Sequence, residues 1–182
     1  VGGLEVHNYR TDLPIRKGLS SSAALCVLIA RAFNRMYDMK MTIRGEMEYA
    51  YQGELTTPSR CGRMDQGCAY GNRAIVMRYD GEFVGVEALS LRGPPLHYVV
   101  VDLAGEKSTT EILAALQAGY PFPRDDTAAG VHRLLGPLNE EICGEAIRHL
   151  EAGDARALGG LMSRAQQLFD ELAGPSCPSQ LS

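Results

Sequence analysis

The chain has 182 residues, of which 45% are hydrophobic and 22% charged, and its formal net charge is −4 at pH 7. This composition is typical of a soluble globular protein that buries a real core, and the negative balance argues against a nucleic-acid partner. No apolar run reaches the roughly 20 residues of a membrane-spanning helix, so we expect no membrane partner either.

The cysteines and histidines give no sign of a metal centre. The five cysteines are scattered, form no Cys-x-x-Cys pair, and stand at positions 26, 61, 68, 143 and 177. The four histidines show no metal-type spacing, so we expect no zinc. Reduced thiols, together with a start at Val1-Gly2-Gly3 that lacks secretory-signal features, predict a cytoplasmic protein.

A strand, a loop and a helix are expected at the start of the chain. Residues 4–10 alternate as a strand does, and residues 21 to about 37 are apolar with a helical period. The connecting run is Pro14-Ile15-Arg16-Lys17-Gly18-Leu19-Ser20-Ser21-Ser22-Ala23-Ala24. Serine is a favoured helix N-cap, and a helix N-terminus attracts anions. With Gly18 permitting close approach of a ligand and Lys17 adding positive charge, the run predicts a phosphate-binding loop, although a capped helix that binds nothing has the same pattern.

Two further helical segments follow. Thr42 is expected to cap a helix from Ile43 to about Leu55, which Pro58 would end. A short helix containing Asp65 is then expected, closed by a glycine at position 71.

Strands and a domain boundary are expected in the middle of the chain. Three strands are predicted at residues 74–79, 83–89 and 96–103, and the first two are expected to form a hairpin. Gly93-Pro94-Pro95 interrupts this pattern. We therefore expect one domain over 1–93 and a second over 94–182.

The last third of the chain is predicted to be helical. The expected helices cover about 108–118, 127–135, 138–152 and 155–172. The last has a clear apolar stripe, which we expect to pack on a sheet. A strand–helix start, then strands and then helices, predicts an α+β fold.

Two motifs resemble those of a known family. The run that ends at Ala24, Pro-x-x-x-Gly-Leu-Ser-Ser-Ser-Ala-Ala, resembles the phosphate loop of the GHMP kinases, which include galactokinase, homoserine kinase, mevalonate kinase and phosphomevalonate kinase. The segment Cys61-Gly62-Arg63-Met64-Asp65-Gln66 is similar to the Cys-Gly-x-Met-Asp-Gln segment of galactokinases and arabinokinase. The triple serine is more similar to the sugar kinases than to the mevalonate branch.

The resemblance implies a fold as well as a family. It implies a two-layer α+β GHMP-kinase-like fold, with an N-terminal part like domain 2 of ribosomal protein S5 and a ferredoxin-like C-terminal part. The family's early acceptor-binding motif and late glycine-rich motif are both missing from these 182 residues. We therefore expect an internal fragment, incomplete at both ends.

The resemblance also implies cofactors and residue roles. A GHMP kinase uses ATP and Mg²⁺ and phosphorylates a small molecule, here a sugar or related alcohol. The residues implied to contact the nucleotide phosphates are Lys17, Gly18, Leu19, Ser20, Ser21, Ser22 and Ala23. Asp65 is implied to be the base or electrostatic partner of the acceptor hydroxyl. Ser22 and Glu54 are implied to hold Mg²⁺, an ion that prefers oxygen ligands.

Simpler alternatives stay open for these residues. Asp65 could be an exposed aspartate stabilised by a helix dipole, Glu54 a solvated helix residue, and Ser22 only a cap. Arg60 and Arg63, beside Asp65, could lower its pKa or contact an anionic substrate. A non-catalytic ligand-sensing relative, a mevalonate-type kinase and a structural or interaction domain of similar architecture also stay open.

Overall fold

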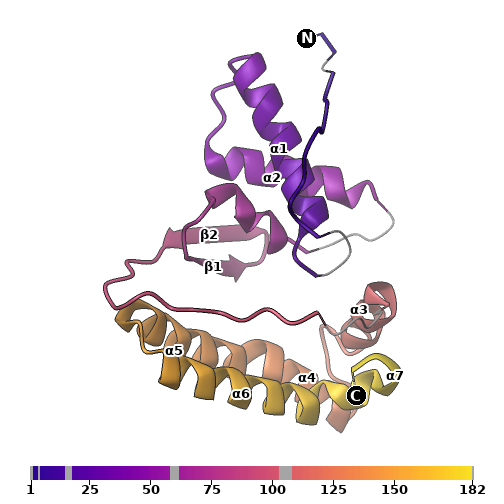
Figure 1. Ribbon diagram of the computed structural model, residues 1–182. Helices are drawn as coiled ribbons and strands as arrows, with labels where there is room; N and C mark the ends of the chain where they lie inside the picture. Colours follow the sequence, from indigo (N-terminus) through magenta and orange to yellow (C-terminus); the bar gives the residue numbers. More distant parts are fainter. Residues whose placement is uncertain (1, 4, 15–17, 58–61, 103–107, 182) are drawn as a thin grey trace. The chain divides into compact units, whose positions relative to one another are not determined.

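A computed structural model of the chain describes residues 2–3, 5–14, 18–57, 62–102 and 108–181. The chain divides into two compact units, residues 1–88 and residues 89–182 (Figure 1). In the described ranges, no helix combines the length and the apolar character that crossing a membrane requires.

The N-terminal unit consists of two helices, a short 3₁₀ helix and a hairpin. In chain order they are α1 (Ser21–Met36), α2 (Ile43–Leu55), η1 (Asp65–Tyr70), β1 (Ile75–Asp80) and β2 (Phe83–Ala88). The helix α1 packs against α2, and both contact η1. The strands are antiparallel and join through a tight turn at Gly81 and Glu82, which confirms the predicted hairpin.

One buried cluster ties these elements together. Its members come from both helices, from η1 and from β2, and none is more than 3% exposed: Val27, Met47, Ala50, Ala69 and Val84. Removing apolar side chains from water is the main favourable term in folding. Because the cluster takes a residue from η1, apolar packing helps to fix the short helix that begins with Asp65.

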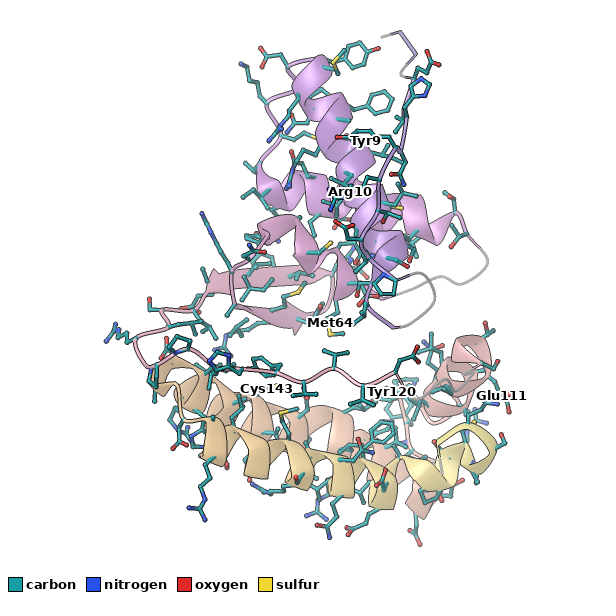
Figure 2. All side chains as sticks on the ribbon, in the orientation of Figure 1. Tyr9, Arg10, Met64, Glu111, Tyr120 and Cys143 are labelled. Carbon is teal, nitrogen blue, oxygen red and sulfur yellow. The ribbon has the colours of Figure 1, made fainter. Side chains whose placement is uncertain are left out.

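Two predicted strands are not formed. Residues 5–10 adopt no regular secondary structure, and Tyr9 is 96% exposed (Figure 2). Residues 96–102 likewise form no strand, and Val99 is 90% exposed. A strand needs a neighbour to complete its backbone hydrogen bonds, and β1 with β2 is the only ladder in the described residues. The outer ends of the two predictions, Leu4 and Leu103, lie outside the described residues.

The C-terminal unit is helical. Its elements are α3 (Thr109–Gln117), α4 (Asp126–Arg133), η2 (Leu134–Leu138), α5 (Asn139–Ala152), α6 (Ala155–Leu172), η3 (Gly174–Ser176) and α7 (Pro178–Leu181). The predicted break at Gly136-Pro137 is a kink within η2, where Gly136 has non-helical angles. The expectation that α6 packs on a sheet is wrong, because α6 packs against α5 and also contacts α4.

The Gly93-Pro94-Pro95 segment is held against the end of α5. The N–H groups of Arg92 and Gly93 both donate to the carbonyl of Glu151, at 2.9 and 3.0 Å. A Cβ on Gly93 would overlap the carbonyl of Ala152, so glycine permits this close approach. Along the chain, the boundary between the two compact units lies between residues 88 and 89.

Candidate functional site

The described part of the predicted phosphate loop is residue 14 and residues 18–24, of which 21–24 form the first turn of α1. Gly18 has a φ of 71°, and Ser20 is left-handed with φ 57° and ψ 35°. A Cβ on Gly18 would meet nothing within 4 Å, so the backbone conformation and not crowding favours glycine there. A serine in the left-handed region is uncommon, and such residues gather at binding and catalytic sites. Lys17 lies outside the described residues.

Within the described residues no side chain caps the start of α1, so the expected serine cap is wrong. Ser20 stands at the N-cap position, but its side chain makes no cap hydrogen bond. The side chains at the N-caps of α2, α3, α4 and α6 do make one: Thr42, Ser108, Asp125 and Asp154. A capping side chain normally sits on extended backbone, which Ser20 lacks. The first turn of α1 therefore keeps N–H groups that an anion can accept from.

The loop residues differ in exposure. Leu19 and Ser22 are exposed, and Ser20 and Ser21 are half-buried. Ala23 is 0% exposed, so its methyl group packs inside the unit.

Glu54 is a buried carboxylate in the last turn of α2. It is 2% exposed, so the interpretation of a solvated helix residue is wrong. Its Oε2 accepts a hydrogen bond from Nε2 of Gln66, a residue of η1 that is 0% exposed. Its backbone carbonyl accepts from the amide and the hydroxyl of Thr57, at 2.9 and 2.7 Å. Both the main chain and the side chain of Glu54 are therefore fixed.

Asp65 is the first residue of η1 and is half-buried. The thiol of Cys68 reports on its surroundings. Burial raises the pKa of Cys68, the negative charges of Asp65 and Glu54 raise it further, and the charge of Arg31 lowers it. Asp65 and Cys68 belong to the same short helix, and Glu54 contacts Gln66 of that helix, so both predicted carboxylates lie near this thiol. Met64, which precedes Asp65, is 70% exposed (Figure 2).

A buried polar network holds the other end of η1. Arg31 of α1 donates to the carbonyl of Ala69 at 2.8 Å and to Oε2 of Glu46 at 2.7 Å. Asn34 donates to Oε1 of Glu46 at 2.8 Å. Burial alone would raise the pKa of Glu46, but the hydrogen bonds from Asn34 and Arg31 and the charges of Arg31 and Arg35 lower it overall. The sequence did not predict this network, because a single arginine in a helix does not indicate that its side chain will be partly buried against a glutamate.

Arg63 has structural partners. Its guanidinium group lies over the ring of Tyr51, 4.6 Å from the centroid, and pairs with Glu48 at 3.4 Å. It also pairs with the carboxylate of Glu82 at 3.2 Å and donates to its carbonyl at 2.8 Å. These contacts join the segment before η1 to α2 and to the hairpin turn. Arg60 lies outside the described residues.

The predicted Mg²⁺ ligands can be compared with the needs of the ion. Among the described residues, no three His, Cys, Asp or Glu side chains form a group suited to a metal. Mg²⁺ is commonly bound through one or two carboxylates, with substrate phosphates and waters completing its shell. The predicted set, one glutamate and one serine hydroxyl, has the number and kind of protein ligands that this pattern requires. Gln66 contacts Glu54 through its Nε2. Its other polar atom, Oε1, is buried and has no hydrogen-bond partner within the described part of the chain.

Comparison with known proteins points to one family. Residues 2–72, which contain the loop, Glu54 and Asp65, match the family model of the GHMP kinases N terminal domain. This match and the relatives described below support membership of the GHMP kinase superfamily. Its similarity to curated members of that superfamily is low, and no solved structure gives a significant match.

Galactokinases and a mevalonate kinase are among the relatives. The chain is 27% identical to the galactokinase of Thermotoga petrophila, over 92% of the chain and 54% of the relative. The same values hold for the galactokinase of a second Thermotoga strain. The mevalonate kinase of Aeropyrum pernix is 25% identical, over 91% of the chain and 49% of the relative. The chain thus spans about half the length of the curated relatives it matches.

Proposed function

We propose that the chain is part of an ATP-dependent kinase that phosphorylates a hydroxyl group of a small molecule, most simply a sugar. The observation that carries this proposal is the start of α1, where a glycine and a serine with positive φ precede a helix that has no side-chain cap among the described residues. A phosphate placed there would accept hydrogen bonds from the first turn and meet the positive end of the helix dipole. In this proposal residues 17–23 bind the ATP phosphates.

Asp65 is proposed to act on the acceptor hydroxyl as a base or electrostatic partner. A carboxylate within hydrogen-bond reach can orient the attacking hydroxyl and accept its proton as the bond to phosphorus forms. A half-buried position at the start of a short helix, tied down by Arg31 and by apolar packing, holds such a group in a defined place.

Glu54 and Ser22 are proposed to hold Mg²⁺. When bound, the ion would neutralise charge on the phosphates. The support is the fixed, buried carboxylate of Glu54 and the exposed hydroxyl of Ser22 in the first turn of α1.

The acceptor is proposed from the motifs. The triple serine and Met64-Asp65-Gln66 favour a sugar, and similarity to two galactokinases agrees with this. A mevalonate-type acceptor is the second candidate, because the mevalonate kinase matches almost as well. We also propose that residues 1–93 and 94–182 are parts of the two domains of a GHMP kinase, with ribosomal-protein-S5-like and ferredoxin-like folds, in the cytoplasm.

The test is ADP release by protein expressed from its full reading frame, with Mg-ATP and a panel of sugars and mevalonate. We expect turnover with one sugar, and Asp65→Ala should lower it by orders of magnitude while ATP still binds. Asp126→Ala is the matched control, since Asp126 also lies in the first turn of a helix, in the other unit. Full activity of Asp65→Ala would refute its role. ATP binding without any turnover would favour the ligand-sensing alternative. Absence of ATP binding would favour an interaction domain.

A further inference from the structure

Gln66 is a buried amide that its surroundings satisfy only in part. It is 0% exposed and is among the largest fully buried side chains of the described residues. Its Nε2 donates to Oε2 of Glu54, whereas its Oε1 has no partner in the described chain. The residue directly follows Asp65 in η1, and its side-chain amide contacts Glu54.

Stability alone does not favour this arrangement. A buried polar atom without a partner costs about 1–3 kcal/mol, and a buried carboxylate is costly even when it has one. An apolar pair of similar volume at positions 54 and 66 would avoid both costs. The orphan oxygen is, however, a ready acceptor for a ligand that brings its own donor.

We propose that Gln66 is a positioning residue for the divalent cation at Glu54. Its Nε2 fixes the Glu54 carboxylate, and its Oε1 accepts a hydrogen bond from a water molecule on the bound cation. Mg²⁺ retains several waters when protein-bound, and such waters are strong donors. The inference rests on the proposed function, because it takes Glu54 as a ligand of the metal.

The expected size of the effect follows from the chemistry of such partners. Groups that hold a metal ligand by hydrogen bonds typically change metal affinity by about 10–100-fold when they are replaced. We therefore expect Gln66→Met, which keeps the length and apolar stem but removes the amide, to weaken cation binding by about 10-fold or more.

The experiment is a titration of the full-reading-frame protein with MnCl₂, in the presence of a non-hydrolysable ATP analogue. Free Mn²⁺ is measured by electron paramagnetic resonance, so the readout does not depend on activity. A titration of the analogue without protein is subtracted, because the triphosphate itself binds Mn²⁺. Gln167→Met is the chemically matched control, because Gln167 donates to Glu171 at 2.9 Å in an exposed pair. Val84→Ala is the stability-matched control, since Val84 belongs to the core of the same unit.

The outcomes separate the inference from the proposed function. Weaker Mn²⁺ binding in Gln66→Met, with both controls at the wild-type value, supports the inference. Affinity within twofold of wild type overturns it and leaves the proposed function intact. An equal loss in Val84→Ala, or failure of both Gln66→Met and Gln66→Asn to fold, assigns Gln66 a purely structural role and also overturns it. Absence of Mn²⁺ binding in the wild type refutes the proposed metal site itself.

Discussion

Replacing Arg31 by methionine should destabilise the N-terminal unit strongly, because it removes the charge that compensates Glu46. The side chains of Arg31 and Glu46 are 28% and 7% exposed. Breaking a buried ion pair by removing one partner costs about 3–5 kcal/mol. Because Arg31 is partly exposed and Glu46 keeps its bond from Asn34, we expect about 2–4 kcal/mol for Arg31→Met. That is a large part of the roughly 5–15 kcal/mol by which domains are stable.

The double variant Arg31→Met/Glu46→Leu should recover much of this loss. It leaves no uncompensated charge, and Asn34 keeps a partner because its Nδ2 also donates to the carbonyl of Met41 at 3.0 Å. Apolar replacement of a whole buried pair is often neutral or stabilising. The carbonyl of Ala69 still loses the bond from Arg31, so recovery should be incomplete.

Urea unfolding followed by circular dichroism measures these differences for the single and double variants. Hydrogen exchange of the Gly71 amide, which donates to the carbonyl of Cys68 at 3.0 Å, reports on η1 separately. Exchange should be faster in Arg31→Met. A double variant no more stable than Arg31→Met would contradict the reasoning, because the cost would then not come from a stranded Glu46 carboxylate.

Three further outcomes are expected. The pKa of Glu46 is lower in the folded chain than the reference value of 4.5, so its stabilisation should be present above pH 4.5 and lost as pH falls through the folded pKa. Glu46→Gln should therefore make the urea midpoint depend less on pH in that range. Gly18→Ala should weaken ATP binding measured by calorimetry and cost about 1 kcal/mol, whereas Gly81→Ala, also at positive φ (55°), should carry only the stability cost. Asp65→Asn should speed alkylation of Cys68 by iodoacetamide near pH 8, since it removes a charge that raises the thiol pKa. An unchanged rate would mean that the charge of Asp65 does not act on this thiol.

Local patterns predicted the helices and the hairpin well. Thr42 caps α2 as expected, with Oγ1 accepting from Gly45 N at 3.2 Å, and Gly71 closes η1 with a positive φ of 70°. Such signals depend on a few neighbouring residues, so they can be recognised without knowing the rest of the fold. The hairpin is similar, because its turn and its alternating strands are adjacent in sequence.

Features that depend on distant partners could not be predicted in this way. Residues 5–10 have the alternation of a strand, but the described chain provides no neighbouring strand. The burial of Glu54 by Gln66, and of Glu46 by Arg31, depends on how α1, α2 and η1 pack. Ser20 fails as a cap because its backbone is left-handed, which residue type alone does not indicate. The roles of Asp65, Glu54 and residues 17–23 stay predictions.

The uncapped start of α1 has a thermodynamic consequence. In the described residues, four helices satisfy one first-turn N–H group with a capping side chain, whereas α1 has no such cap. A ligand that binds only the folded state raises stability by RT ln(1 + [L]/Kd), about 2.7 kcal/mol at a hundredfold excess over Kd. If α1 binds a nucleotide as proposed, the melting temperature of the N-terminal unit should rise with nucleotide concentration.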